Sequence, residues 1–257
     1  MKRWSDTLWI FIRSIKIYFR VPFIVLMTII QPILWMFLFG EVFSSMADIP
    51  GFGGESYIEY LGPGIVMMST MMAGAYAGLG IINDHREGIL DRLLISPIHR
   101  SAIAMGGLLQ EAATMVIQAL LMIGVSALLG ATFSGGLIGI IQLTIIAVLL
   151  GLGMGMLSTS LALFLLKEES LTAAVSFITM PLLFLSGMFI PLELVPDWIE
   201  KFAAINPLNW AVEAGREIIT TQPDWSIVIP NSSYLLLLFI IACVLVLLAF
   251  RKYQKSL

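Results

Sequence analysis

Residues 101–166 read SAIAMGGLLQ EAATMVIQAL LMIGVSALLG ATFSGGLIGI IQLTIIAVLL GLGMGMLSTS LALFLL. Glu111 is the only Asp, Glu, Lys or Arg in this stretch. A helix needs about 20 apolar residues to cross the hydrocarbon core of a bilayer, so the stretch is about three times too long for one crossing. A turn-rich cluster, Gly130-Ala-Thr-Phe-Ser-Gly-Gly136, divides it. The stretch therefore predicts two successive membrane-spanning helices.

Four further apolar runs flank this stretch and complete a pattern of six crossings. The predicted spans are 21–43, 60–82, 101–129, 137–164, 170–190 and 230–250. Over the whole chain, 59% of the 257 residues are hydrophobic and 12% are charged, which is about half the charged fraction of a soluble domain. The sequence therefore predicts an all-α membrane protein, a single transmembrane domain over residues 1–257 with six transmembrane helices.

The Lys and Arg residues lie mostly on one side of this predicted membrane. Of the 14 in the chain, Lys201 and Arg216 fall on the other side, which leaves twelve around the termini and in the connections 83–100 and 167–169. Basic residues accumulate on the cytoplasmic side of membrane proteins. We therefore expect both termini in the cytoplasm and the chain in the cell membrane.

Residues 1–20 have the pattern of an amphipathic helix that lies on the inner leaflet. Apolar residues recur at helical spacing: Trp4, Leu8, Phe11, Ile15 and Phe19. Arg13, Lys16 and Arg20 fall on the opposite side, where they can meet anionic lipid headgroups. The alternative is a basic flank that only fixes the orientation of the first span.

The connection 83–97 predicts a short helix with one charged and one apolar face. Asp84, Glu87 and Asp91 recur at i, i+3 and i+7, so they share a helical face, and Pro97 ends the helix. The apolar face consists of Ile89, Leu90, Leu93 and Leu94. Such a helix can dock in a groove of a cytosolic partner. It can equally lie against its own helix bundle, and the pattern does not separate the two alternatives.

The loop before the last span predicts two helices with a break between them. The first opens at Asp197, and Asn206 and Pro207 take the N-cap and N1 positions of the second. Trp210 and Trp225 suit the aromatic belt at a membrane surface. This outer helical hairpin can shape the mouth of a pathway or simply cap the bundle.

Motifs for enzymatic chemistry are absent from the sequence. There is no G-x-x-x-x-G-K-[ST] phosphate loop, so this chain does not bind ATP in that way. His85 and His99 lie in one connection without a second cluster of metal ligands. We therefore expect that the chain is not an enzyme, that it binds no metal or cofactor of its own, and that it has no nucleic-acid partner.

Glu111 is the one acid inside a predicted span. An ionised residue at membrane depth is energetically costly and usually faces a bundle interior, a cavity or a partner. Thr114 and Gln118 extend its face along the same helix, and Gln142 on the next helix can complement it. These four residues are candidates for a substrate pathway, or for a proton-linked switch. The alternative is a protonated Glu111 that only holds helices together.

Glycines recur at a spacing of four within two predicted spans, at Gly74 and Gly78 and at Gly151 and Gly155. Small residues at this spacing let membrane helices pack closely. The spacing is common, so it identifies no particular interface.

Two stretches together carry a resemblance to a known family. The first is Asp84-His-Arg-Glu-Gly-Ile-Leu-Asp-Arg-Leu-Leu-Ile-Ser-Pro97. The second is Ser186-Gly-Met-Phe-Ile-Pro191, followed by Asn206-Pro-Leu-Asn209 and Arg216. With the six spans and the amphipathic N-terminus, the chain resembles the membrane subunits of ABC-2 type ABC exporters, in particular the daunorubicin-exporter-like and nodulation-type branch.

This resemblance implies a role that the spacing of residues does not show. The segment 83–97 would be the coupling helix that engages a cytosolic ABC ATPase subunit, which would bind the ATP and Mg. The implied ATPase-coupling residues are Asp84, Arg86, Glu87, Gly88, Asp91, Arg92, Pro97 and Glu168. The chain would work as a homodimer, as a permease for an amphipathic or hydrophobic substrate such as a drug, a lipid or a lipid-linked glycan.

The main alternative is a proton-coupled secondary transporter that uses Glu111. Such transporters usually carry several intramembrane charges and internal repeats. The sequence has one such charge and no convincing repeat. A membrane-embedded enzyme is a further alternative, and the lack of a catalytic cluster disfavours it.

Overall fold

The computed structural model describes residues 22–45, 56–88 and 100–254, and helices account for nearly all of this part of the chain. The helices are α2 (Pro22–Val42), α3 (Tyr57–Ala75), α4 (Gly78–Arg86), α6 (Arg100–Leu128), α7 (Gly136–Leu165), α8 (Glu168–Phe184), a 3-10 turn η2 (Leu192–Leu194), α9 (Asp197–Ala203), α10 (Pro207–Ile218) and α11 (Trp225–Gln254). The predicted interfacial helix at 1–20 lies outside the described residues.

Among the described residues, four helical segments are long and apolar enough to cross a membrane: Tyr57–Arg86, Gly107–Leu128, Gly136–Leu165 and Trp225–Tyr253. The described apolar part of α2, Ile30–Val42, is shorter, and α8 has 17 residues. The structure therefore bears out an all-helical protein with long apolar helices.

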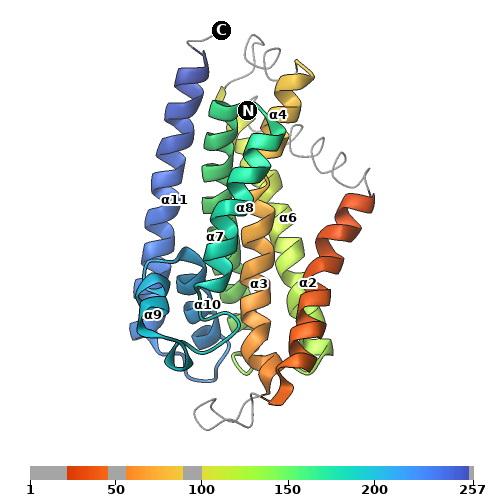
Figure 1. Cartoon of the computed structure of the whole chain (residues 1–257), viewed down its shortest axis with the longest axis vertical. Helices are drawn as coiled ribbons and strands as arrows, with labels where there is room; N and C mark the ends of the chain where they lie inside the picture. Colours follow the sequence, from red (N-terminus) through yellow and green to blue (C-terminus); the bar gives the residue numbers. More distant parts are fainter. Residues whose placement is uncertain (1–21, 46–55, 89–99, 255–257) are drawn as a thin grey trace.

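The long helices form a bundle with α3 at its centre (Figure 1). Buried residues follow one another without interruption from Leu61 to Met71 of α3. In Figure 1, α2 and α11 lie on opposite sides of the bundle. The end of α4 and the C-terminal end of α11 lie at one end of the molecule, and α9 and α10 lie at the other.

The pair Gly74 of α3 and Gly78 of α4 meets the glycine-rich face of α7. A Cβ atom at Gly74 would overlap the carbonyl oxygen of Gly151, and one at Gly78 would lie 2.6 Å from the carbonyl oxygen of Ser158. A Cβ at Gly155 would lie 3.6 Å from the Gly74 Cα. The small residues therefore bring the two backbones into direct contact, which apolar side chains would prevent.

The helix predicted over 60–82 is interrupted in the structure. Tyr76 and Ala77 separate α3 from α4, and the hydroxyl group of Ser158 on α7 bridges the interruption. Ser158 donates to the carbonyl oxygen of Ala75 at 2.5 Å and accepts from the N–H of Gly78 at 3.2 Å. Backbone groups that leave a helix inside a membrane need such substitutes.

The helix predicted within 170–190 is shorter in the structure, because α8 ends at Phe184. Residues 185–190 are mostly apolar and read as a continuation of the helix. Their backbone instead exchanges hydrogen bonds with side chains of the following loop and accepts from the hydroxyl groups of Tyr57 and Tyr60 on α3.

Candidate functional site

Arg216 of α10 holds the backbone segment that follows α8. Its Nη2 donates to the carbonyl oxygens of Gly187 and Met188 at 2.8 and 3.0 Å, and its Nε donates to the carbonyl oxygen of Tyr60 at 3.2 Å. The guanidinium lies 3.5 Å from the centroid of the Tyr60 ring, which adds a cation–π attraction. One side chain thus joins α3, α10 and the segment after α8.

Two asparagines of the outer hairpin hold the same segment. Asn206 Nδ2 donates to the carbonyl oxygens of Leu182 and Leu185, both at 2.8 Å. The N–H of Gly187 donates to Asn209 Oδ1 at 2.9 Å. Asn206 also accepts from the N–H of Leu208 at 2.9 Å, so its predicted N-cap role is confirmed, with Pro207 at the first helical position.

Glu213 connects this network to the last helix. Asn209 Nδ2 donates to its Oε1 at 2.7 Å, and Asn231 Nδ2 of α11 donates to its Oε2 at 3.0 Å. Burial lowers the pKa of the Arg216 guanidinium, while Tyr60 and Glu213 act in the opposite direction. The predicted hairpin is therefore present as α9 and α10, and polar contacts hold α10 against its neighbours.

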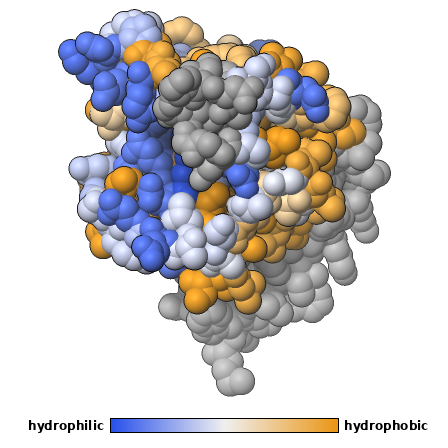
Figure 2. Space-filling model, turned by 90° about the horizontal axis from the view of Figure 1, so that it is seen from below, coloured by the Kyte–Doolittle hydropathy of each residue, from blue (hydrophilic) through white to orange (hydrophobic). Residues whose placement is uncertain are grey.

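The surface at this end of the molecule differs in hydropathy from one side to the other. Figure 2 shows hydrophilic residues over one side of the end and hydrophobic residues over the other. Trp198, Phe202 and Ile205, which the sequence places on one face of the hairpin, have relative exposures of 55%, 52% and 70%. Such an exposed apolar face can meet lipid or another protein.

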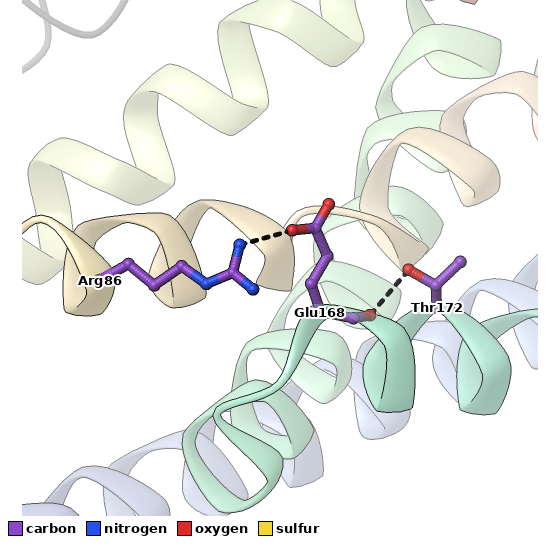
Figure 3. Close-up of polar contacts among 3 residues, drawn as sticks. All are labelled: Arg86, Glu168 and Thr172. Carbon is purple, nitrogen blue, oxygen red and sulfur yellow. Dashed lines mark hydrogen bonds and ion pairs between the residues drawn. The ribbon is translucent and has the colours of Figure 1, made fainter.

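At the opposite end, two of the implied ATPase-coupling residues meet. Arg86 Nη1, in the last turn of α4, lies 2.8 Å from Glu168 Oε2 in the first turn of α8 (Figure 3). Thr172 Oγ1 donates to the Glu168 carbonyl oxygen at 2.9 Å, one turn further along α8. Both charged side chains are about half exposed. The two connections predicted on the cytoplasmic side are therefore adjacent in space.

The continuous helix predicted over 83–97 is wrong in its first part. Residues 83–86 are the last turn of α4, Glu87 caps that helix, and Gly88 has φ +65°. This left-handed backbone suits glycine and ends an α-helix. Asp84 and Glu87 therefore lie at the C-terminal end of α4, and not on a helix that continues through Gly88. Asp91, Arg92 and Pro97 lie outside the described residues.

The sequence did not predict the contact between His85 and Tyr253 in the last turn of α11. The Tyr253 hydroxyl lies 2.8 Å from His85 Nδ1, and the two rings meet edge to face. His85 drew attention only as a possible metal ligand. Tyr253 is the one aromatic residue within the basic C-terminal tail, and this was the only local signal.

The four candidate pathway residues are not gathered at one place. Glu111 Oε2 of α6 lies beside Gly155 of α7, 3.1 Å from the position of a Cβ there. Gln118 Nε2 donates to the Ser69 carbonyl oxygen of α3 at 3.3 Å, and its Oε1 is buried without a partner among the described residues. Thr114 Oγ1 donates to its own helix, at the carbonyl oxygen of Gln110. These three residues line one face of α6.

Gln142 lies far from Glu111 along the bundle. It lies on α7 and is partly buried. It lies thirteen positions before Gly155, the α7 neighbour of Glu111, which corresponds to about 20 Å along a helix. A single polar site that contains both Glu111 and Gln142 is therefore not present in this chain.

The long apolar helices and their buried backbone contacts define a polytopic α-helical membrane protein. The chain matches the ABC-2 type transporter family over residues 5–220. It therefore belongs to this family.

Three relatives illustrate the similarity. The chain is 26% identical over 196 residues to the daunorubicin resistance ABC transporter permease protein DrrB1 of Streptomyces coeruleorubidus, which covers 76% of this chain and 67% of the relative. It is 31% identical over 209 residues to the putative transport permease ycf38 of Porphyra purpurea, covering 80% and 71%. It is 25% identical over 165 residues to the probable multidrug ABC transporter permease YbhR of Escherichia coli (strain K12), covering 64% and 44%.

Family membership makes the chain the membrane permease subunit of an ABC transporter. Such subunits carry no ATPase domain, so an ATPase subunit is implied as partner. The family resemblance is therefore confirmed, and the proton-coupled alternative is set aside.

Proposed function

We propose that the chain forms, with a second copy of itself, the pathway of an ATP-driven exporter for an amphipathic or hydrophobic substrate. The observation that carries this proposal is the family match over residues 5–220. The names of two relatives support the substrate class, because one confers daunorubicin resistance and the other is a probable multidrug permease. Drugs, lipids and lipid-linked glycans all belong to this class.

The proposal includes six crossings of the cell membrane, with both termini in the cytoplasm. Beyond the four long helices, the first and fifth crossings are α2 with 21 residues and α8 with 17, both within the length range of a membrane helix. The orientation rests on the distribution of Lys and Arg. A reporter fused after Leu257 is expected to be inaccessible from outside an intact cell, and its exposure there would contradict this topology.

The ATPase subunit, with its ATP and Mg, is proposed to dock on the end of the molecule that carries Arg86 and Glu168. Their ion pair supports this placement, because it sets the connections 83–100 and 167–169 side by side. One partner can therefore contact both. The proposed docking residues are Asp84, Arg86, Glu87, Gly88, Asp91, Arg92, Pro97 and Glu168.

The test of this docking surface is a pair of charge reversals at opposite ends of the chain. Glu87→Lys with Asp91→Lys is expected to leave the protein folded but to uncouple ATP hydrolysis from daunorubicin transport in vesicles that contain the permease and its ATPase. The control is Glu193→Lys with Asp197→Lys, which changes the charge equally at two exposed outer positions. Equal coupling in both double variants would reject the docking assignment.

The pathway residues Glu111, Thr114, Gln118 and Gln142 remain a proposal, and Glu111 is the one to test. Glu111 lies between α6 and α7 within a single chain, so it can act by controlling how these helices pack. Glu111→Gln is expected to fold and to lose transport, while Glu169→Gln, at an exposed position, keeps it. Transport by Glu111→Gln that matches the unmodified protein at every pH would leave Glu111 with a structural role only.

A further inference from the structure

Two neighbouring residues in the last turn of α4 contact different helices. Arg86 pairs with Glu168 of α8 at the surface, where solvent weakens an ion pair. His85 contacts Tyr253 of α11, with 2.8 Å between His85 Nδ1 and the hydroxyl oxygen. Tyr253 is 5% exposed and packs in a small apolar cluster with Leu163 of α7. The contact with α11 is therefore the more sheltered of the two.

Helix α4 and helix α11 differ in how they connect to the rest of the bundle. At Tyr76 and Ala77 the backbone hydrogen bonds change to the tighter i→i+3 pattern, as from the N–H of Ala77 to Gly74 and from the N–H of Gly80 to Ala77. Such a stretch inside a helix often marks a hinge, so α4 can change its angle to α3 here. Helix α11 is continuous from Trp225 to Gln254. A displacement of Tyr253 is therefore carried along α11, whereas a displacement of α4 is partly absorbed at the break.

The other end of α11 reaches the outer hairpin. Asn231 lies 22 residues before Tyr253, which is about 33 Å along a helix. Its Nδ2 donates to Glu213 of α10 at 3.0 Å, and the ring of Tyr234 lies 5.3 Å from that of Trp210 on α10. One helix thus has a polar contact with α4 at one end and a polar contact with α10 at the other.

We propose that His85 and Tyr253 are positioning residues that pass the movement of α4 to α11, and through Asn231 and Glu213 to the outer hairpin. This inference rests on the proposed function, in which the ATPase subunit acts on the segment that begins at α4. A packed helix moves as a unit between discrete arrangements, so a contact at its end can set its position. The route is a coupling hypothesis and needs a measured coupling.

The experiment follows the outer hairpin directly and needs no substrate. An environment-sensitive fluorophore is attached at Lys201→Cys, an exposed position of α9, in a chain whose Cys243 is replaced by Ala. The labelled permease is reconstituted with its ATPase subunit, and the fluorescence change on addition of Mg-ATP is recorded alongside ATP hydrolysis. Tyr253→Phe removes one hydroxyl and keeps the ring. Ser233→Ala is the matched control, because it removes an exposed hydroxyl that donates to the Ile229 carbonyl oxygen of the same helix.

The unmodified complex is expected to give a fluorescence change that Ser233→Ala preserves. Tyr253→Phe is expected to shift the responding equilibrium by about fivefold, the effect of one lost hydrogen bond, while ATP hydrolysis continues. Asn231→Ala is expected to do the same, and His85→Ala combined with Tyr253→Phe to be no worse than either alone. A normal response in Tyr253→Phe, or no response in the unmodified complex while it hydrolyses ATP, overturns the inference. Failure to assemble with any ATPase subunit would instead overturn the proposed function, and the inference with it.

Discussion

Replacement of Arg216 by Met is expected to destabilise the outer end of the protein by about 3 kcal/mol. The guanidinium donates to three carbonyl oxygens, those of Tyr60, Gly187 and Met188. Met fills a similar volume but donates no hydrogen bond. A buried acceptor that loses its donor costs about 1–3 kcal/mol, and we take the lower value because Arg216 is only partly buried. The Gly187 oxygen keeps a second donor, the Tyr60 hydroxyl at 2.6 Å. We therefore count about 1 kcal/mol for each of the Tyr60 and Met188 oxygens and about 1 kcal/mol for the lost cation–π contact with the Tyr60 ring.

Thermal unfolding of the purified permease in detergent measures this loss through tryptophan fluorescence. For a chain of this size, 1 kcal/mol corresponds to about 2–4 °C in the melting temperature, so Arg216→Met is expected to melt about 9 °C lower. Arg216→Lys should fall between the two, because a single ammonium group cannot reproduce the planar fork of donors. Lys201→Met is the control, since Lys201 is an exposed base in the same hairpin.

A melting temperature for Arg216→Met within about 2 °C of the unmodified protein would refute this reasoning. It would mean that the segment after α8 finds other donors, from water or from a shifted α10. The same result would remove Arg216 from the contacts that hold the hairpin in place.

Three further changes test other parts of the fold. Gly74→Ala is expected to cost about 3 kcal/mol, because the new Cβ would overlap the α7 backbone, whereas Gly80→Ala meets nothing within 4 Å and serves as its control in the same melting assay. Ser158→Ala is expected to cost about 1–2 kcal/mol, because it leaves the backbone groups of the α3–α4 break without a partner; an unchanged melting temperature would contradict this. Hydrogen bonds from Ser226 lower the pKa of Asp224 below its ordinary value of 3.8. The cap it gives to α11 is therefore complete above that pH and lost as the pH falls below it. Amide protection of Ser226, corrected for intrinsic exchange, should show this loss, and Asp224→Asn should not.

The long helices could be predicted from length and hydropathy because a membrane imposes both. Asn206 and Pro207 marked the start of α10 for a local reason, since an N-cap and a first-turn proline act on their own helix. The break after Ala75 had no such local sign. It depends on the hydroxyl of Ser158, which lies 83 residues away in the sequence. The early end of α8 is similar, because Asn206, Asn209 and Arg216 supply its hydrogen bonds from the following loop.

For the candidate site too, the sequence predicted some residues, but their contacts needed the structure. Arg86 and Glu168 came from a family pattern, and the pairing of their side chains needed the structure. The spacing of polar residues predicted a polar face on α6 that includes Glu111 and Gln118. It could not predict how far Gln142 of α7 lies from Glu111 along the bundle. The contact of His85 with Tyr253 joins residues 168 positions apart. No local pattern encodes a contact of this kind.

The two ends of the molecule are held by contacts of different strength, and this difference bears on how the transporter can move. At the end that carries α9 and α10, side-chain hydrogen bonds form a network around Arg216, Asn206, Asn209 and Glu213, in which one charged group makes several bonds. At the opposite end, an exposed ion pair joins α4 to α8 and one hydrogen bond joins it to α11. Ile82 of α4 also packs with Leu171 and Val175 of α8 in an apolar cluster that is smaller than the main core. Regions with few buried contacts open at a lower free energy than well-packed ones. In the proposed docking, an ATPase subunit that acts on the end of α4 works against a smaller apolar cluster there, while the network around Glu213 keeps α10 and α11 together as one body that can follow.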